Sequence, residues 1–449
     1  MSAAVALATL TPRDPAAADF AHVAPTLPGA NVAWLAKLRR EALERFVLHG
    51  LPTTREEAWK YTNVAPLAKR PYTVGTSGGV ARVVDVDAFA FPDLGAHLMV
   101  FVDGRFSPAL SRIGALPAGC TLTSVADVVA RAPDRVEAAF RAPAQTIFSD
   151  LNAAFTRDGL YLHLAAGVLL DAPVHALFVA TRDDVVSHPR SVVVAEAGAQ
   201  AFVIEHHASA GAASYVTNAV TQIDIGPNAS VGHCKLQQEG ARAFHVAAVQ
   251  ATQARASSFE SQSLALGAAL ARADIATVFA DEGCNAALAG LYLASGRQHV
   301  DHHTLVDHAK PHGTSRELYK GVLDDGARAV FNGKVVVRPN AQKTDAHLAN
   351  HNLLLSKSAE IDTKPELTID ADDVKCSHGA TVGQLDETAL FYLRSRAIDP
   401  ATARALLTYA FAHDVVLRIP LAPVRTALER LLLARLPQAE RLRELSSPL

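Results

Sequence analysis

Two side chains with affinity for soft metals, Cys376 and His378, stand one residue apart in the segment 375–398. In an extended chain both point to the same face, because side-chain direction repeats every second residue. The pair could therefore bind one metal ion, one cluster or one partner surface. A closed tetrahedral site needs about four ligands, so the pair alone does not complete one. The alternative is that both residues are simply packed or hydrogen-bonded, with a lone buried thiol protonated and inert.

A histidine-rich segment, 299–312, is a second place where metal chemistry could be expected. Its spacing matches no helical zinc motif such as H-E-x-x-H, and on a strand its side chains would divide between two faces. We therefore predict a hydrogen-bonded turn of the fold here rather than a metal centre. The residues concerned are Asp301, His302, Asp307, His308 and His312.

Motifs for independent catalysis are missing from the sequence. Lys334 follows Gly333, but no G-x-x-x-x-G-K-[ST] phosphate loop surrounds it, and neither a G-x-S-x-G elbow nor a G-x-G-x-x-G fingerprint occurs. The pattern favours a protein without a catalytic site of its own. The alternative from another functional class is a polysaccharide-active enzyme such as a lyase, which would use acidic and basic groups along a groove.

Composition restricts the class of partner. The chain has 449 residues, 49% of them hydrophobic, and a net charge of −3, which predicts two or three domains and leaves no basic surface for nucleic acid or membrane lipid. No apolar run approaches the roughly 18 residues of a membrane helix. The four cysteines, Cys120, Cys234, Cys284 and Cys376, form no C-x-x-C pair, which favours a reducing compartment, the cytoplasm.

The N-terminal part, residues 1–80, is predicted to be helical after a flexible start. Apolar residues recur at helical spacing between Val32 and Val47, and Gly50 with Pro52 ends that helix. Thr54 with a glutamate three residues later predicts a capping box and a second helix. Trp59, inside that second helix, is expected in the core.

Residues 81–380 consist of short β-rich runs separated by glycine, aspartate and asparagine turns. Alanines within these runs recur at intervals of 28, 27, 30, 43 and 30 residues, which is typical of a stacked β solenoid with one long coil. A β sandwich is the alternative, because it also gives short strands at regular spacing. The aligned alanines are Ala201, Ala229, Ala256, Ala286, Ala329 and Ala359.

Residues 381–449 are helical again. Asp386 and the pair Asp399-Pro400 are predicted N-caps, and the segment 420–423 separates a last helix that runs through Leu436. The first of these helices carries apolar residues beside two arginines, a pattern of ordinary core with solvated charge or of a surface for a partner protein. The residues of this predicted docking surface are Leu390, Phe391, Leu393, Arg394 and Arg396.

The strings A-D-D-V-K-C-S-H-G-A-T-V-G-Q-L-D at 371–386 and L-F-Y-L-R-S-R at 390–396 resemble the SufB/SufD family of iron-sulfur cluster assembly proteins. R-E-E-A-W-K-Y-T at 55–62 is similar to the N-terminal region of that family. The glycine after His378 and the string G-Q-L-D at 383–386 resemble the SufD branch of the family. The SufB branch carries a cysteine in the region that corresponds to residues 347–353, and this sequence has no cysteine there. His351 stands near that position.

The resemblance implies a mainly β fold, a central right-handed parallel β-helix flanked by N-terminal and C-terminal α-helical domains. It also implies pairing with a SufB-like paralogue, binding of a SufC-like ATPase through the C-terminal helices, and ATP hydrolysis in that partner. His378, with Cys376 as the weaker candidate, would help hold iron or a nascent iron-sulfur cluster transiently at the interface. Whether the chain forms a homodimer in the absence of the paralogue is not decided by the sequence. The family also suggests a reduced flavin, for which no residue of this sequence defines a pocket.

Overall fold

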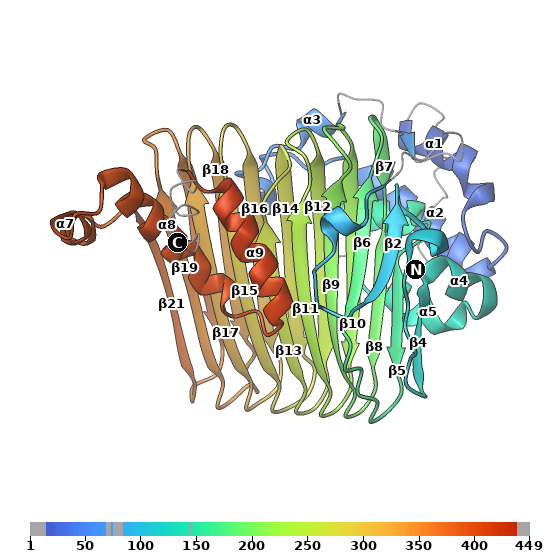
Figure 1. The fold of residues 1–449 in the computed structure, drawn as a ribbon. Coiled ribbons are helices and arrows are strands. Elements are labelled where there is room, and N and C mark those ends of the chain that lie inside the picture. The colour runs from blue at the N-terminus through green and yellow to red at the C-terminus, as the bar shows by residue number, and fades with distance from the viewer. Residues whose placement is uncertain (1–14, 69–72, 75–83, 144–145, 438–449) are drawn as a thin grey trace.

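The computed structural model describes residues 15–68, 73–74, 84–143 and 146–437, so the start before Pro15 and the boundary predicted at residue 80 lie outside the described residues. Its centre is a parallel β-helix in which successive coils give one strand to each of two sheets (Figure 1). The first sheet, in spatial order, contains β20 (Glu360–Ile369), β18 (Arg328–Val337), β16 (His299–His308), β14 (Leu270–Phe279), β12 (Phe244–Gln253), β10 (Val216–Ile225), β8 (Arg190–Ala195), β5 (Leu160–Leu164) and β4 (Cys120–Ser124), with β1 (Thr73–Val74) and β7 (Val185–Ser187) at its side.

The second sheet contains β21 (Lys375–Gly383), β19 (Asp345–Leu354), β17 (Thr314–Leu323), β15 (Asn285–Ala294), β13 (Ser258–Ala265), β11 (Ser230–Gln238), β9 (Gln200–Ser209), β6 (Val174–Ala180), β2 (His97–Val102) and β3 (Arg105–Phe106). From β8 onward the pairing is parallel and in register from coil to coil. The predicted mainly β solenoid is therefore confirmed.

The alanine alignment that suggested the repeat was wrong in register. Ala201 and Ala286 do share a column of the second sheet, through Val231 and Phe259. Ala329, however, lies on the first sheet, so the interval of 43 residues is about one and a half ordinary coils. The remaining three alanines lie in turns just before or between strands: Ala229, Ala256 and Ala359.

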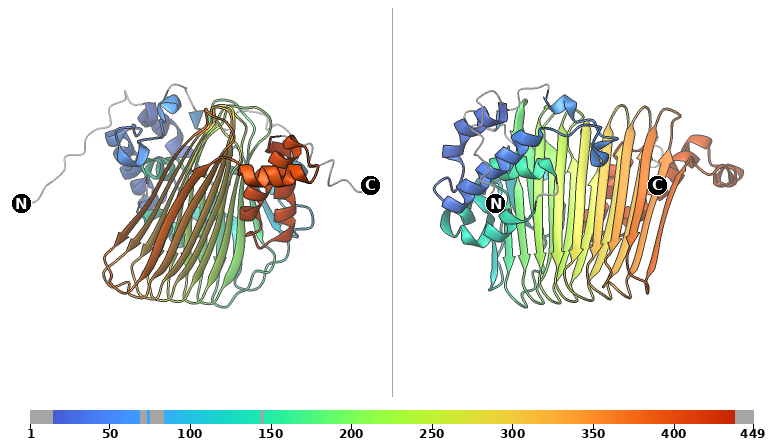
Figure 2. Two further views of the ribbon diagram at one scale, coloured as in Figure 1. Left: turned by 90° about the vertical axis from the view of Figure 1, so that its left-hand side faces the viewer. Right: turned by 180° about the vertical axis from the view of Figure 1, so that it is seen from behind.

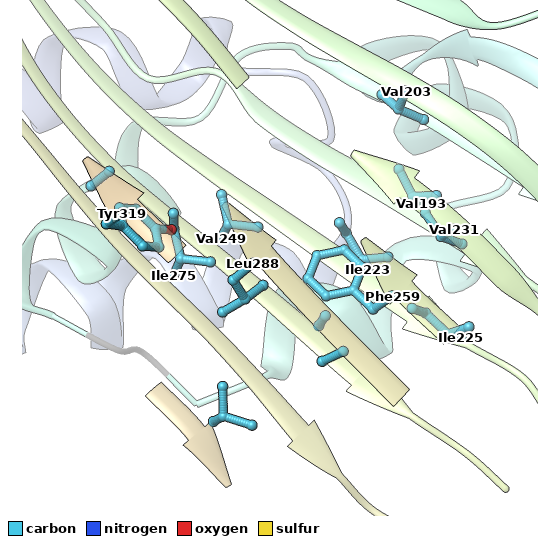
Figure 3. Close-up of a cluster of buried hydrophobic side chains, with 14 of the residues drawn as sticks. Val193, Val203, Ile223, Ile225, Val231, Val249, Phe259, Ile275, Leu288 and Tyr319 are labelled. Atoms are coloured by element: carbon cyan, nitrogen blue, oxygen red, sulfur yellow. The ribbon is translucent and has the colours of Figure 1, made fainter. Parts of the chain in front are cut away.

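The interior of the β-helix is filled by inward-facing side chains from both sheets (Figure 3). Ile223 and Ile275 come from the first sheet, whereas Val231, Phe259 and Leu288 come from the second. All five are at most 2% exposed. A single coil cannot bury these residues, so each coil depends on its neighbours for a continuous core.

Helices cover the outer faces of the two sheets on opposite sides of the solenoid (Figures 1 and 2). On the N-terminal side are α1 (Pro15–Val23), α2 (Ala33–His49), α3 (Ala65–Ala68), α4 (Val125–Arg131), α5 (Asp134–Arg141) and α6 (Ile147–Phe155). On the C-terminal side are α7 (Glu387–Ser395), α8 (Pro400–Val416) and α9 (Ala422–Arg435). Short 3-10 turns occur at Ala24–Thr26, Glu57–Trp59, Asp87–Phe89 and Pro108–Leu110. No described helix is long and apolar enough to cross a membrane.

Local signals at helix ends were predicted with mixed success. The helix before Gly50 ends there, and Gly50 adopts a φ of 70°, which glycine tolerates best. Asp386 and Asp399 cap α7 and α8 as predicted. The prediction of a second helix after Thr54 was wrong, because only a 3-10 turn forms there. Trp59 is buried as expected. Helices α4 to α6 lie within the segment that was interpreted as β-rich.

Candidate interface at the end of the solenoid

The solenoid ends in two strands that are paired on one side only among the described residues. β20 pairs with β18, and β21 pairs with β19. Ile369 and Val382, at the far ends of these strands, are 41% and 49% exposed. Unpaired backbone N–H and C=O groups beside exposed apolar side chains form a template for another strand. The last coil is therefore a candidate interface.

Cys376 and His378 both lie on β21, opposite Ala346 and Leu348 of β19. Ala346 and Leu348 belong to the interior core, so the same face of β21 continues the interior of the solenoid. Cys376 packs against that core and is half-buried, whereas His378 is exposed because no further coil covers it. The strand thus presents the imidazole at the open end of the β-helix.

The Cys376 thiol is poorly suited to act alone as a soft ligand. Burial raises its pKa, and the carboxylate of Asp345 adds to that rise, against a backbone hydrogen bond from Ala346 that lowers it. A thiol with a raised pKa stays protonated at neutral pH, and the thiolate is the form that binds metals. His378 is the better placed of the two residues.

The described residues contain no group of three or more histidine, cysteine, aspartate or glutamate side chains arranged to hold a metal ion. A site at His378 would therefore need ligands from a second molecule docked on the open coil.

The histidine-rich segment forms the strand β16 and the turn after it, so it belongs to a hydrogen-bonded coil of the solenoid as predicted. His302 Nε2 lies 3.2 Å from Ser263 Oγ, and His308 Nε2 lies 2.9 Å from Ser315 Oγ. Burial lowers the pKa of His302 to about 3 and that of His308 to about 4, so both imidazoles are neutral. Asp301 accepts a hydrogen bond from Arg272 at 2.8 Å, and Asp307 pairs with Arg338 at 2.9 Å. His312 lies in the turn after β16, with a φ of 61°.

His351 is not brought together with His378. It lies on β19 at a position that alternates with the interior residues Asn350 and Asn352, and its Nδ1 is 2.8 Å from Thr381 Oγ1. The two histidines therefore occupy opposite faces of the second sheet.

The predicted docking surface divides between core and solvent. Leu390 is 7% exposed and packs with α8, and Leu393 is half-buried. Phe391 is 71% exposed, and Arg394 and Arg396 are exposed as well. Figure 1 shows α7 projecting beyond the last coil, so its outer face is open to a partner.

Tyr392 belongs to the same exposed face and was missed from the sequence. It is 54% exposed, and the Arg396 guanidinium lies 4.7 Å from its ring centroid. The available signal was the pair of adjacent aromatic residues at 391 and 392, since a helix of this length can bury only one side.

Buried polar side chains inside the solenoid were also missed. The Glu205 carboxylate accepts hydrogen bonds of 2.6 Å from Ser191 and Thr221 and lies 3.0 Å from His233 Nε2. Glu317, 4% exposed, is in the same column of the second sheet as Leu348 and His378, and neither of its carboxyl oxygens has a hydrogen-bond partner of good geometry. The buried carboxyl group of Glu205 is therefore fully hydrogen-bonded, whereas that of Glu317 is not.

Comparison with known proteins agrees with this architecture. The family model described as SUF system FeS cluster assembly, SufBD core domain, matches residues 178–411, and the model of the SufBD protein N-terminal region matches residues 20–176. The chain belongs to the SufBD family. It is an iron-sulfur cluster assembly protein of that family, as the resemblance at 371–396 indicated.

Relatives that match over most of their length are also described as iron-sulfur cluster assembly proteins. An iron-sulfur cluster assembly SufBD family protein of Synechocystis sp. is 34% identical over 396 residues, which span 85% of this chain and 86% of the relative. The iron-sulfur cluster assembly protein SufD of Escherichia coli is 34% identical over 380 residues, 84% of this chain and 87% of that protein. SufD of Bacillus subtilis is 26% identical over 414 residues.

Proposed function

We propose that this SufBD family protein is a non-catalytic, cytoplasmic subunit that pairs through its last coil with a SufB-like paralogue and contributes His378 to a shared site for iron or a nascent cluster. The observation that supports the proposal is the exposed imidazole on β21, a strand that among the described residues is paired on one side only, at the open end of the solenoid. A neutral imidazole is a competent iron ligand, and a cysteine thiolate of the partner would supply the soft sulfur.

β21 is the better edge for pairing with the paralogue. β20 carries Pro365, which has no N–H to donate, flanked by the charged Lys364 and Glu366, and both features discourage strand addition. β21 has no proline and carries small residues, Gly379 and Ala380, at its centre. Strand addition here would place a partner strand beside His378.

The second contact proposed is with a SufC-like ATPase at the exposed face of α7. Phe391 and Tyr392 supply apolar area, and Arg394 and Arg396 supply charge at its rim. Aromatic and arginine side chains with this exposure are typical of residues that dominate binding energy at interfaces. Movement of the ATPase on ATP hydrolysis would then strain the paired subunits and open their shared site.

A matched pair of histidine variants tests the shared site. His378→Ala is expected to leave complex formation intact but to lower the iron retained after anaerobic reconstitution. His347→Ala is the control, because His347 is also exposed but lies on the outer face of the adjacent strand. If His378→Ala retains normal iron and Cys376→Ala does not, the cysteine is the ligand and the assignment of His378 is wrong.

The ATPase contact is tested separately with Phe391→Ala, which should weaken ATPase binding while the β-helix partner still binds. Leu48→Ala is the matched control, since Leu48 is an exposed apolar residue, 80% accessible, on the N-terminal helix α2. Equal ATPase binding by both variants would exclude α7 as the docking surface.

A further inference from the structure

A cleft of about 400 Å³ lies between the N-terminal helices and the outer face of the first sheet. Its walls come from α2, α5 and α6, and its floor comes from β10 and β12. This volume falls in the range of sites for small organic molecules. The cleft is far along the chain from the last coil and takes no part in the function proposed above.

The floor and walls of the cleft are chemically mixed. Leu38, Phe140, Ala153, Val220 and Ala248 supply apolar area. Gln222, Gln250 and Ser149 supply hydrogen-bonding groups. Ligand sites commonly combine an apolar lining with a few polar groups that fix orientation.

Arg190 is the central residue of this site. It lines the cleft but is only 4% exposed. Its guanidinium lies over the aromatic ring of Phe140, 4.7 Å from the ring centroid. Its terminal nitrogens donate to two uncharged acceptors, Asn152 Oδ1 at 3.4 Å and the Ala139 carbonyl at 3.1 Å, and its Nε has no partner. A buried cation without a counter-ion is costly.

The other charges around the cleft only partly offset Arg190: the Asp150 carboxylate raises its pKa against the lowering by burial, but that carboxylate is shared with Arg45. The ion pairs around the cleft are Asp150 with Arg45 at 2.6 Å, Glu41 with Lys37 at 3.7 Å, and Arg141 with Glu137 at 2.7 Å. Among the described residues, no carboxylate lies within ion-pair distance of Arg190. The positive charge of Arg190 is therefore only partly compensated.

Ser149 is a second, independent sign of a missing ligand. Its side chain is in the first turn of α6, only 7% exposed, and lines the same cleft. Its hydroxyl has no hydrogen-bond partner. Buried hydroxyl groups are nearly always satisfied, so an unpartnered hydroxyl in the same cleft as Arg190 marks a place where an acceptor is absent.

We propose that this cleft binds a small organic anion whose carboxylate or phosphate group pairs with Arg190 and accepts a hydrogen bond from Ser149. The apolar walls would hold the body of the ligand, and Gln222 and Gln250 would contact its polar edge. Arginine is suited to this task because its planar guanidinium matches carboxylate and phosphate oxygens.

The test uses the full chain and two probes, inorganic phosphate and succinate, titrated calorimetrically against a chloride control of equal ionic strength. At least one probe should bind the wild type, and the responding probe tells phosphate from carboxylate chemistry. Arg190→Gln should weaken that binding by about 10- to 100-fold, the loss expected for a charge-assisted hydrogen bond.

Two further variants separate binding from folding. Ser149→Ala removes a hydroxyl that has no partner, so it should weaken anion binding without lowering the melting temperature of the unliganded chain. Arg39→Gln is the matched control, because Arg39 is also buried with an unpartnered Nε but does not line the cleft. Absence of binding of either probe to the wild type, or equal binding by wild type, Ser149→Ala and Arg190→Gln, would overturn the proposal.

Discussion

Replacement of Glu317 by glutamine should raise the stability of the folded protein at high pH, because it removes a charged group from the interior. Its carboxyl group is buried in the interior of the solenoid without a good hydrogen bond. Burial raises its pKa from the ordinary 4.5 to about 7, against a weaker lowering by the nearby Thr304 hydroxyl. In the unfolded chain the group loses its proton near pH 4.5, whereas the folded protein keeps it until about pH 7.

The sign of the pH dependence follows from this difference. Between pH 4.5 and 7 the folded state binds more protons than the unfolded state, so the free energy of unfolding falls as pH rises, and the loss is complete above pH 7. At about 1.4 kcal/mol per pKa unit, the loss amounts to about 3 kcal/mol. Glutamine has the shape of the protonated carboxyl group and does not ionise. Glu317→Gln should therefore be more stable than wild type at pH 8 and nearly equal to it at pH 5.

The assay is urea unfolding at pH 5 and pH 8, supported by amide hydrogen exchange of β15, β17 and β19, because coils of a solenoid can unfold locally. Glu205→Gln is the matched control with the opposite sign. Burial would raise the pKa of Glu205, but His233 and two hydroxyl donors outweigh it and lower the pKa to about 2. Glu205→Gln weakens the hydrogen bonds that the carboxylate accepts from Ser191 and Thr221 and its contact with His233, so it should cost about 1.5–3 kcal/mol at pH 8. A Glu317→Gln variant that is less stable than wild type at pH 8 would refute the account of an unpaired carboxyl group.

Three other variants test the packing of the helices and the solenoid. Arg272→Met removes the guanidinium that pairs with the buried carboxylate of Asp301, which then keeps only Thr62 and His303 as partners. It should lower the free energy of unfolding by about 3 kcal/mol in urea titrations, and a neutral effect would contradict this. Gly290→Ala would place a methyl group 2.1 Å from the Tyr319 ring and should cost about 1–3 kcal/mol, seen as a lower melting temperature. Asp399→Ala removes the N-cap of α8 and should cost about 1 kcal/mol, and an unchanged melting temperature would count against the cap.

Features that depend on neighbouring residues could be predicted from the sequence. The caps Asp386 and Asp399 and the helix end at Gly50 each use a side chain or φ angle within one turn of the element they define. The β solenoid was predicted from short strands at regular intervals together with the family resemblance. Its register was not, because an alanine such as Ala256 fits a turn as readily as an inward position on a strand.

The polar interior could not be predicted because both faces of several strands are covered. On β9, Ile204 packs beneath the C-terminal helices, whereas Glu205 points into the solenoid. Alternation of apolar and polar residues normally assigns the polar set to solvent, and here that rule gives the wrong face. Only the three-dimensional pairing of Glu205 with His233 and two hydroxyl groups explains how a carboxylate is stable there.

The candidate interface was predicted only as far as one chain allows. Alternation along a strand indicates that Cys376 and His378 share a face, and the structure adds that this face lies on the last, uncovered coil. The half-burial that raises the pKa of Cys376, and the exposure of Tyr392, depend on where the solenoid ends and how α7 leaves it. A ligand set shared by two molecules cannot be identified from either sequence alone.

The most direct test of the central claim is affinity purification of this chain co-expressed with a SufB-like and a SufC-like protein, with stoichiometry and iron content measured after anaerobic reconstitution. The account predicts a stable ternary complex that retains more iron than the isolated chain, and loss of that excess in His378→Ala but not in His347→Ala. A chain that purifies alone, retains no iron with either partner and cleaves acidic polysaccharide would contradict it.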